Sequence, residues 1–339
     1  METELEVRGR NIPSAGFISP RLSEVLFKSG NRGFDSIAAL PSNVHAIESS
    51  LLFASGLQPF AALVGSSGWG KSHLLEAARV RLCQQLGHKG VEVVDAGDWN
   101  GACTRVDPTA PLILENVQDI LNRSKIRLQL RLVLERRVRA GRPTILSFTS
   151  PKVTRQIRSF LPNHREWMIA QVGVPSCQER ILVVKQMMLT EQLQLSDELV
   201  KVLATKLNGN GLTLIGALKR LKIKSSRWVQ PEETIAGLGL LDPFFADNSS
   251  WDFRDHLCES AERFLADQGS PVCHRDLMMY ALLWIAGLPE DDVAAYLKVE
   301  PARAYSQARE FERKMKSCDL TTAQVHRFIE KCVAELPDC

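Results

Sequence analysis

The stretch "ALVGSSGWGKSHLLEAARV", residues 62–80, carries the pattern that decides the fold. Within it the motif G-x-x-x-x-G-K-[ST] begins at Gly65 and ends at Ser72. A short apolar run precedes the motif and apolar residues with a period near 3.6 follow it, so the sequence predicts a strand, a glycine-rich turn and a helix. In that context the backbone amides of the turn face a polyphosphate, Lys71 places a cation on the terminal phosphates, and the Ser72 hydroxyl can coordinate Mg²⁺.

The motif therefore predicts that the chain binds ATP or ADP together with Mg²⁺. The residues of the loop predicted to contact the nucleotide are Gly65, Ser66, Ser67, Gly68, Trp69, Gly70, Lys71, Ser72 and His73. Trp69 is unusual in such a loop. Its ring can stack on a partner, shield the phosphates, or simply lie against the following helix.

Strands and helices alternate on either side of this motif. After the loop, strand patterns occur at residues 90–97, 111–117 and 143–150, and a helical period occurs at 127–141. Such alternation predicts an α/β fold in which a parallel sheet is sandwiched by helices. Beyond residue 176 the strand patterns stop, and amphipathic helices are predicted at 177–192, 196–207 and 213–223.

These patterns divide the chain into four parts. We expect an irregular N-terminal arm at 1–30, a nucleotide-binding core at 31–174, a helical lid at 175–240 and a helical C-terminal domain at 250–339. The last boundary is placed in "LGLLDPFFADNSSW", residues 238–251, where Gly, Pro, Asp and Ser cluster. Four helical segments follow it, at 251–269, 273–287, 289–299 and 301–317.

Composition excludes several classes of protein. No apolar run approaches the roughly 18 residues of a membrane helix, and "METELEVRGR" is charged where a secretory leader would be apolar. We therefore expect a soluble, cytoplasmic chain with no membrane partner. The seven histidines lack ligand-like pairing, which argues against a structural metal. The formal net charge of +3 is too small to identify a nucleic-acid binder by itself.

Hydrolysis of the nucleotide needs further groups beside the loop. "LILENVQ" is the only apolar run after the loop that ends in an acid, so Glu115 is the candidate for the magnesium shell. Asn116 stands where a second carboxylate would act as general base, and an amide cannot do so. Asp95, at the end of the second strand, can contact water near the magnesium or cap a helix. Slow or absent turnover is predicted, so the chain is at most a weak ATPase.

Three stretches, "FDSIAALPSNVHA" (34–46), "LILENVQDI" (112–120) and "TILSFTSPK" (144–152), resemble the DnaA/Hda family of AAA+ replication initiators and regulators. The resemblance runs from about residue 34 to 315. It implies an AAA+ core, a helical lid and an all-α helix-turn-helix-like domain, with Pro41 and Asn43 on the adenine side and Thr149 as a sensor of the γ-phosphate.

The resemblance also shows where this chain departs from the family. In "GLTLIGALKRL", residues 211–221, Leu212 stands in place of the arginine that touches the nucleotide. Alignment puts His164 on the arginine finger, with Arg158 and Arg165 as nearby substitutes. The loop between the second and third strands is too short for the extra helices that DnaA carries, and in this respect the core resembles Hda.

The C-terminal part resembles the duplex-binding domain of DnaA around "CHRDLMMYALLWIAGLPEDDVAAYL", residues 273–297. The segment that reads DNA in that family corresponds here to "LKVEPARA", residues 297–304, whose residues differ. The contacts to duplex DNA predicted from this match are His274, Arg275, Lys298 and Arg303. Between Arg123 and Arg165 there are also twelve Lys or Arg and one acid, either a nucleic-acid or partner surface or a solvated helix face.

The resulting prediction is a DnaA-like protein that binds nucleotide and duplex DNA, self-associates, and acts in or regulates chromosomal replication initiation with weak or no ATP hydrolysis. The alternative is an adaptor that keeps ADP bound and works through protein contacts with an initiator, a helicase or a sliding clamp. A helicase or transposition loader would need single-stranded DNA, and such loaders generally lack the final domain.

Overall fold

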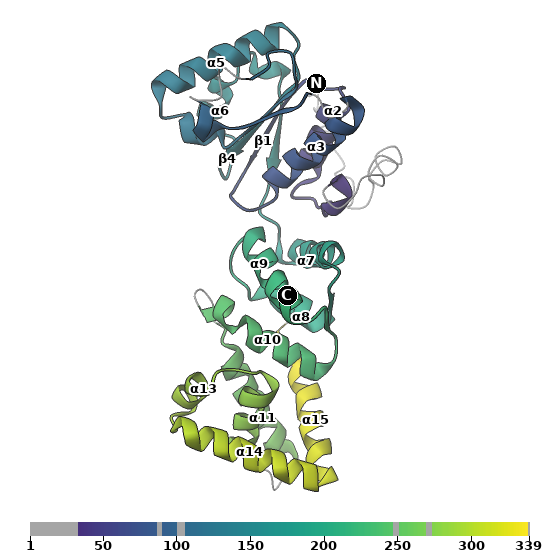
Figure 1. Cartoon of the computed structure of the whole chain (residues 1–339), viewed down its shortest axis with the longest axis vertical. Coiled ribbons are helices and arrows are strands. Elements are labelled where there is room, and N and C mark those ends of the chain that lie inside the picture. The colour runs from purple at the N-terminus through teal and green to yellow at the C-terminus, as the bar shows by residue number, and fades with distance from the viewer. Residues whose placement is uncertain (1–32, 87–89, 100–105, 247–250, 269–272, 338–339) are drawn as a thin grey trace, which may run out of the picture.

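The computed structural model describes residues 33–86, 90–99, 106–246, 251–268 and 273–337. One end of the molecule in Figure 1 is a sheet covered by helices, and the other end is almost entirely helical. The predicted N-terminal arm lies outside the described residues.

Five parallel strands form the sheet, in the order β2-β3-β4-β1-β5. They are β1 (Phe60–Gly65), β2 (Glu92–Asp95), β3 (Leu112–Glu115), β4 (Thr144–Thr149) and β5 (Met168–Val172). The register places Gly65 beside Thr149 and Asp95 beside Glu115, so the last residues of four strands meet at one edge. The α/β fold with a parallel sheet, predicted from the alternation of patterns, is confirmed.

Helices cover both faces of the sheet, as Figure 1 shows. They are α2 (Val44–Ala54), α3 (Lys71–Leu86), α5 (Ser124–Arg139) and α6 (Arg155–Phe160), with short 3-10 turns η1 (Phe34–Ser36), η2 (Ala96–Asp98), η3 (Val117–Ile120) and η4 (His164–Glu166). Alternate residues of β1 point to opposite faces. Phe60 and Val64 pack with the cluster under α5 and α6, whereas Ala61 and Leu63 pack with the cluster under α2 and α3.

One arginine of the basic helix α5 is buried and fixes the helix to the sheet. Arg137 is 3% exposed and donates hydrogen bonds to the Thr144 hydroxyl at 2.9 Å and to the carbonyls of Ala110 and Pro143. Burial lowers its pKa to about 10. Arg131 and Arg136 remain exposed on the outer face, so both interpretations of this basic helix stay open.

Four helices form the lid: α7 (Cys177–Glu191), α8 (Asp197–Thr205), α9 (Gly211–Lys224) and α10 (Pro231–Ala246). Side chains of Ser176, Ser196 and Asn210 cap the first three, which explains why each begins where it does. The expectation that strands stop after residue 176 is wrong in one detail. Two-residue strands β6 (Gln194–Leu195) and β7 (Arg227–Trp228) pair in parallel, too short to give a sequence pattern.

The C-terminal helices are α11 (Phe253–Gln268), α12 (His274–Tyr280), α13 (Glu290–Leu297), α14 (Pro301–Ser317) and α15 (Asp319–Ala334), with a π-helical turn η5 (Ala281–Ile285) after α12. Helix α15 was not among the predicted segments. Within the described residues, no helix combines the length and apolar character needed to cross a lipid bilayer.

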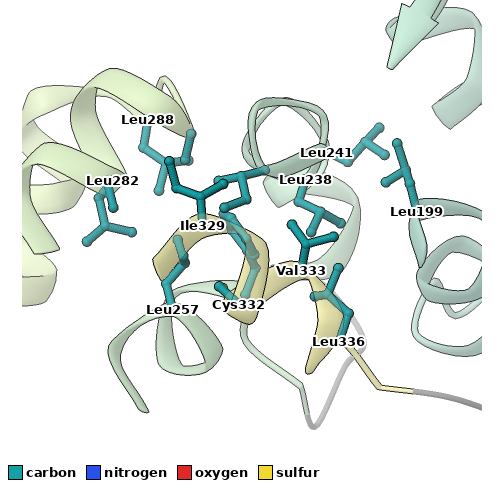
Figure 2. Close-up of a cluster of buried hydrophobic side chains, with 14 of the residues drawn as sticks. Leu199, Leu238, Leu241, Leu257, Leu282, Leu288, Ile329, Cys332, Val333 and Leu336 are labelled. Carbon is teal, nitrogen blue, oxygen red and sulfur yellow. The ribbon is translucent and has the colours of Figure 1, made fainter. Parts of the chain in front are cut away.

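A single apolar cluster joins the lid to the C-terminal helices. Figure 2 shows Leu238 of α10 beside Val333 of α15, and Leu241 of α10 beside Leu199 of α8. Helix α10 also continues through most of the segment in which the sequence suggested a boundary, with Pro243 inside it. The division into domains stays a prediction, and the two helical parts share one core.

Within this shared core, α10 lies very close to the backbone at the end of η5, and this approach depends on a glycine. A Cβ atom added to Gly239 of α10 would collide with the carbonyl oxygen of Ala286. No rotamer change can relieve a clash with backbone, so α10 or the end of η5 would have to move.

We therefore expect Gly239→Ala to lower the free energy of unfolding by about 1–3 kcal/mol, measured by urea denaturation. Gly216→Ala in α9 is the matched control, because the nearest atom to its added Cβ is a Phe244 ring carbon at 3.6 Å. Helix propensity makes that change neutral or stabilising by up to about 1 kcal/mol. Equal effects of the two substitutions would show that the approach of α10 to Ala286 is not tight.

Candidate functional site

The turn between β1 and α3 borders a cavity of about 420 Å³. Gly68 and Gly70 have φ of 78° and 96°, the left-handed region that glycine adopts without strain. The cavity is lined by the predicted loop residues Ser67, Gly68, Trp69, Gly70, Lys71, Ser72 and His73. Gly65 and Ser66 lie beneath them and contribute their carbonyls.

Lys71 is the buried cation of this site. Its side chain is 6% exposed, and Nζ donates hydrogen bonds to the carbonyl oxygens of Gly65 at 2.9 Å and Ser66 at 2.8 Å. Burial lowers the pKa of the ammonium, and no carboxylate of the described residues forms an ion pair with it. An ammonium that is desolvated but not neutralised is stabilised by an anion placed in the cavity.

Ser72 and Glu115 form the second element of the site. The Ser72 hydroxyl donates a hydrogen bond of 2.6 Å to Oε2 of Glu115, which ends β3. A hydroxyl and a carboxylate are hard oxygen ligands of the kind that Mg²⁺ prefers. The structure therefore brings together the two residues that the sequence predicted as metal ligands, and the donor set fits that ion.

Asn116 is held by a neighbouring carboxylate. It adopts φ of 55°, and its Nδ2 donates a hydrogen bond of 2.7 Å to Oδ2 of Asp95 at the end of β2. Oδ1 of the same carboxylate accepts from the Gly97 amide at 2.8 Å, so the predicted capping role of Asp95 is confirmed. Asn116 lines the cavity and carries no group there that can accept a proton from water.

Thr149, the predicted phosphate sensor, ends β4 and lines the cavity. Its backbone amide donates a hydrogen bond of 2.7 Å to the side chain of Gln118. Sequence reasoning did not single out Gln118. The only clue was its position three residues after Glu115, and the contact to Thr149 depends on two strands being adjacent in space.

The entry segment before α2 forms one wall of the cavity. The amide side chain of Asn43 accepts from Leu40 N and donates to the Ala38 carbonyl, both at 2.9 Å. Asn43 therefore lines the cavity, but both polar atoms of its side chain form hydrogen bonds within its own segment. Pro41 is exposed and is not among the lining residues. His73 contacts the Ser36 hydroxyl at 2.7 Å and so joins the loop helix to this wall.

The lid forms the opposite wall of the cavity. Of the lid residues in this wall, only Leu212 was singled out from the sequence. The lid residues at the cavity are Val183, Gln186, Met187, Thr190 and Glu191 of α7 and Gly211, Leu212 and Ile215 of α9. The side chain of Leu212 is 66% exposed at the cavity mouth. No basic residue of the lid is among the residues that line the cavity.

The predicted finger residues lie elsewhere. Arg158 on α6 and His164 and Arg165 in η4 are exposed and do not line the cavity.

The four residues predicted to contact DNA do not form one cluster. His274 and Arg275 begin α12, whereas Lys298 ends α13 and Arg303 lies in the first turn of α14. Rings of Trp284 and Tyr305 lie 5.3 Å apart and those of Tyr280 and Phe311 5.4 Å apart, so η5 and α12 run antiparallel to α14. The two pairs of residues therefore lie towards opposite ends of α14.

Comparison with known proteins shows which solved structures have a similar fold. No protein-family model and no curated protein matches the sequence. Domain III of the Thermotoga maritima replication initiation protein DnaA is similar with a TM-score of 0.52 at 18% identity, over 64% of this chain and 98% of that one. AMPPCP-bound DnaA from Aquifex aeolicus is similar with a TM-score of 0.50 at 16% identity, over 92% of this chain and 100% of that one.

A replication initiator DnaA bound to AMPPCP and single-stranded DNA gives the same TM-score of 0.50 at 16% identity, with 92% and 100% coverage. The chain has a DnaA-like AAA+ fold. At these identities the likeness concerns the architecture, and the chemistry of the cavity must be argued from its own residues.

The hydrogen bond between Asp95 and Asn116 predicts a charge-dependent coupling. Asn116→Asp places two carboxylates side by side, in a residue that tolerates the positive φ, and should lower the free energy of unfolding by about 0.5–1 kcal/mol in low salt. The double variant Asp95→Asn with Asn116→Asp exchanges the partners, keeps a capping side chain at position 95 and should recover most of that loss. Urea denaturation of all four proteins gives the coupling, and additive effects would mean that the two side chains act independently.

Proposed function

We propose that this chain is a DnaA-like protein that binds ATP or ADP with Mg²⁺ in the cavity beside the glycine-rich turn. The observation that carries the proposal is Lys71, a buried ammonium that faces a cavity of about 420 Å³ with no carboxylate to neutralise it. The volume lies within the range of about 300–1,000 Å³ that is usual for small-molecule sites.

Each wall then has a role towards the nucleotide. The turn amides and Lys71 hold the phosphates, while the entry segment around Asn43 and the apolar residues of α7 enclose the base. Ser72 and Glu115 would hold Mg²⁺, which neutralises phosphate charge when bound. Thr149 orients towards the terminal phosphate, and Gln118 fixes the backbone of Thr149.

The same geometry supports weak or absent hydrolysis. Asn116 presents an amide where water would have to be deprotonated, and Asp95 is occupied by that amide and by the Gly97 backbone. Leu212 supplies no positive charge to the phosphates from α9. Transition-state charge would therefore be stabilised mainly from the core side by Lys71.

We further propose that the C-terminal helices bind duplex DNA and that the protein acts in, or regulates, replication initiation in the cytoplasm, with self-association through the surface that carries Arg158 and Arg165. Helix α14 supports this, because Arg303, Arg309 and Arg313 are exposed, and Arg309 and Arg313 lie one turn apart on the same face. Two neighbouring exposed cations on a helix suit a polyanion.

The second candidate is an adaptor that retains ADP and acts through contacts with an initiator, a helicase or a sliding clamp. Asn116 and Leu212 favour it, since both remove groups that turnover would use. The two candidates share the nucleotide and differ in whether a phosphate is ever released.

Lys71→Ala tests nucleotide binding and separates the candidates. With ADP or ATP at about 100 times its dissociation constant, wild-type protein should gain about 2.7 kcal/mol of stability, and the variant should lose that gain because its cation is missing. Thermal melting measures the shift, and phosphate release measures turnover. A weak ATPase loses turnover on substitution, whereas the adaptor never had any.

Lys219→Ala is the control for this experiment, because Lys219 is an exposed lysine of α9 that does not line the cavity. It should behave as wild type. A wild-type melting temperature that ignores both nucleotides would contradict the proposed site.

For DNA binding we expect the double variant Arg309→Ala with Arg313→Ala to lower duplex affinity about 10- to 100-fold near 50 mM salt, measured by fluorescence anisotropy. The slope of log K against log salt should fall by about two, one for each lost phosphate contact. Arg136→Ala with Arg139→Ala on α5 is the matched control. A loss confined to the α5 variant would move the contact to the core and remove α14 from the proposal.

A further inference from the structure

The tip of the glycine-rich turn is packed against the lid. Trp69 is half buried and belongs to two apolar groups at once, the cluster of α2, α3 and the sheet and the cluster of the lid and C-terminal helices. It is the only residue that both clusters share among those described. One side chain of the phosphate loop therefore bridges the two parts of the molecule.

Arg180 of α7 holds the ring of Trp69 from the lid side. Its Cζ lies 5.9 Å from the centre of the ring, which is within the range of a cation–π contact. A terminal nitrogen of the guanidinium donates to the Leu207 carbonyl, while the buried Nε has no hydrogen-bond partner. Burial lowers the pKa of Arg180, so it is a second desolvated cation beside the loop.

The backbone of the turn touches the lid as well. A Cβ atom on Gly68 would collide with the side chain of Asn210, and one on Gly211 would come within 2.6 Å of the Gly68 carbonyl oxygen. Asn210 is the residue that caps α9, accepting from Leu212 N at 3.0 Å. A change in the backbone of the turn at Gly68 must therefore displace the first turn of α9.

The lid carries the C-terminal helices with it. Besides the shared apolar cluster, His326 of α15 lies 2.7 Å from a carboxylate oxygen of Glu232 in α10. Gly239 of α10 lets the end of η5 approach to backbone contact. Because packed interiors resist deformation, a rotation of α7 and α9 moves this whole helical body.

We propose that Trp69 and Arg180 are positioning residues that couple occupancy of the phosphate loop to the orientation of the lid and, through the shared core, to the exposed face of α14. This inference rests on the proposed binding of nucleotide at the loop. A polyphosphate fixes the turn that carries Trp69, so the ring is held against Arg180 and the lid when the site is filled. The family resemblance places an arginine at position 212, where this chain has leucine. The contact between Trp69 and Arg180 takes over the coupling in its place.

The test compares hydrogen exchange of full-length protein with and without saturating ADP and Mg²⁺, with occupancy confirmed separately by calorimetry. In wild type, nucleotide should slow exchange of α7 and α9 amides at least about 5-fold, with a smaller slowing in α14. Arg180→Gln and Trp69→Ala, each at saturating nucleotide, should lose most of this slowing in the lid while keeping it in β1 and the first turn of α3.

Conservative and distant variants make the result specific. Trp69→Phe and Arg180→Lys keep the ring and the charge, and should recover much of the lid protection. Trp284→Ala removes another half-exposed tryptophan, whose ring packs against Tyr305 of α14 in the C-terminal helices, and should match wild type.

Two outcomes overturn the coupling. Either Arg180→Gln keeps the full nucleotide-dependent slowing in α7 and α9, or wild type binds nucleotide with no change in those helices. Absence of any heat of binding in wild type is a different result, because it removes the proposed nucleotide site together with the coupling built on it. If Trp69→Ala does not fold, Arg180→Gln and Arg180→Lys decide the matter.

Discussion

The rest of the site depends on the ammonium of Lys71, held under the glycine-rich turn by two backbone carbonyls. Those carbonyls satisfy its hydrogen bonds but leave its charge without a counterion in a place from which water is largely excluded. The turn, the end of β3 and the lid are arranged around this one uncompensated charge. The charge of Lys71 alone therefore favours an anionic ligand in the cavity, whichever nucleobase or metal ion accompanies it.

Near that cation an amide, Asn116, stands where nucleotide hydrolysis would need a general base. The pair formed by Asp95 and Asn116 satisfies both side chains within the sheet edge and keeps the carboxylate out of the cavity lining. Under the proposed function, this arrangement would favour long residence of an intact nucleotide over its turnover. A protein that reports which nucleotide it holds would then keep its signal for as long as the ligand stays bound.

The sequence was sufficient for the parts of the structure that local patterns encode. The loop from Gly65 to Ser72 and the strand that ends at Glu115 follow from motif and periodicity. What it could not give are contacts between distant segments, such as Gln118 with Thr149 or Arg137 with Ala110. Composition also misled at residues 238–246, where Gly and Pro suggested a linker but tertiary packing keeps α10 helical. The separation of the predicted DNA contacts likewise depends on the antiparallel packing of helices.

The packing of α10 against α15 affects how far the chain can be shortened from its C-terminal end. Leu238 and Leu241 are fully buried in the apolar cluster that α10 shares with the C-terminal helices. A chain cut after α10 would lose part of the apolar surface that packs around these leucines, and exposed apolar surface of this kind promotes aggregation.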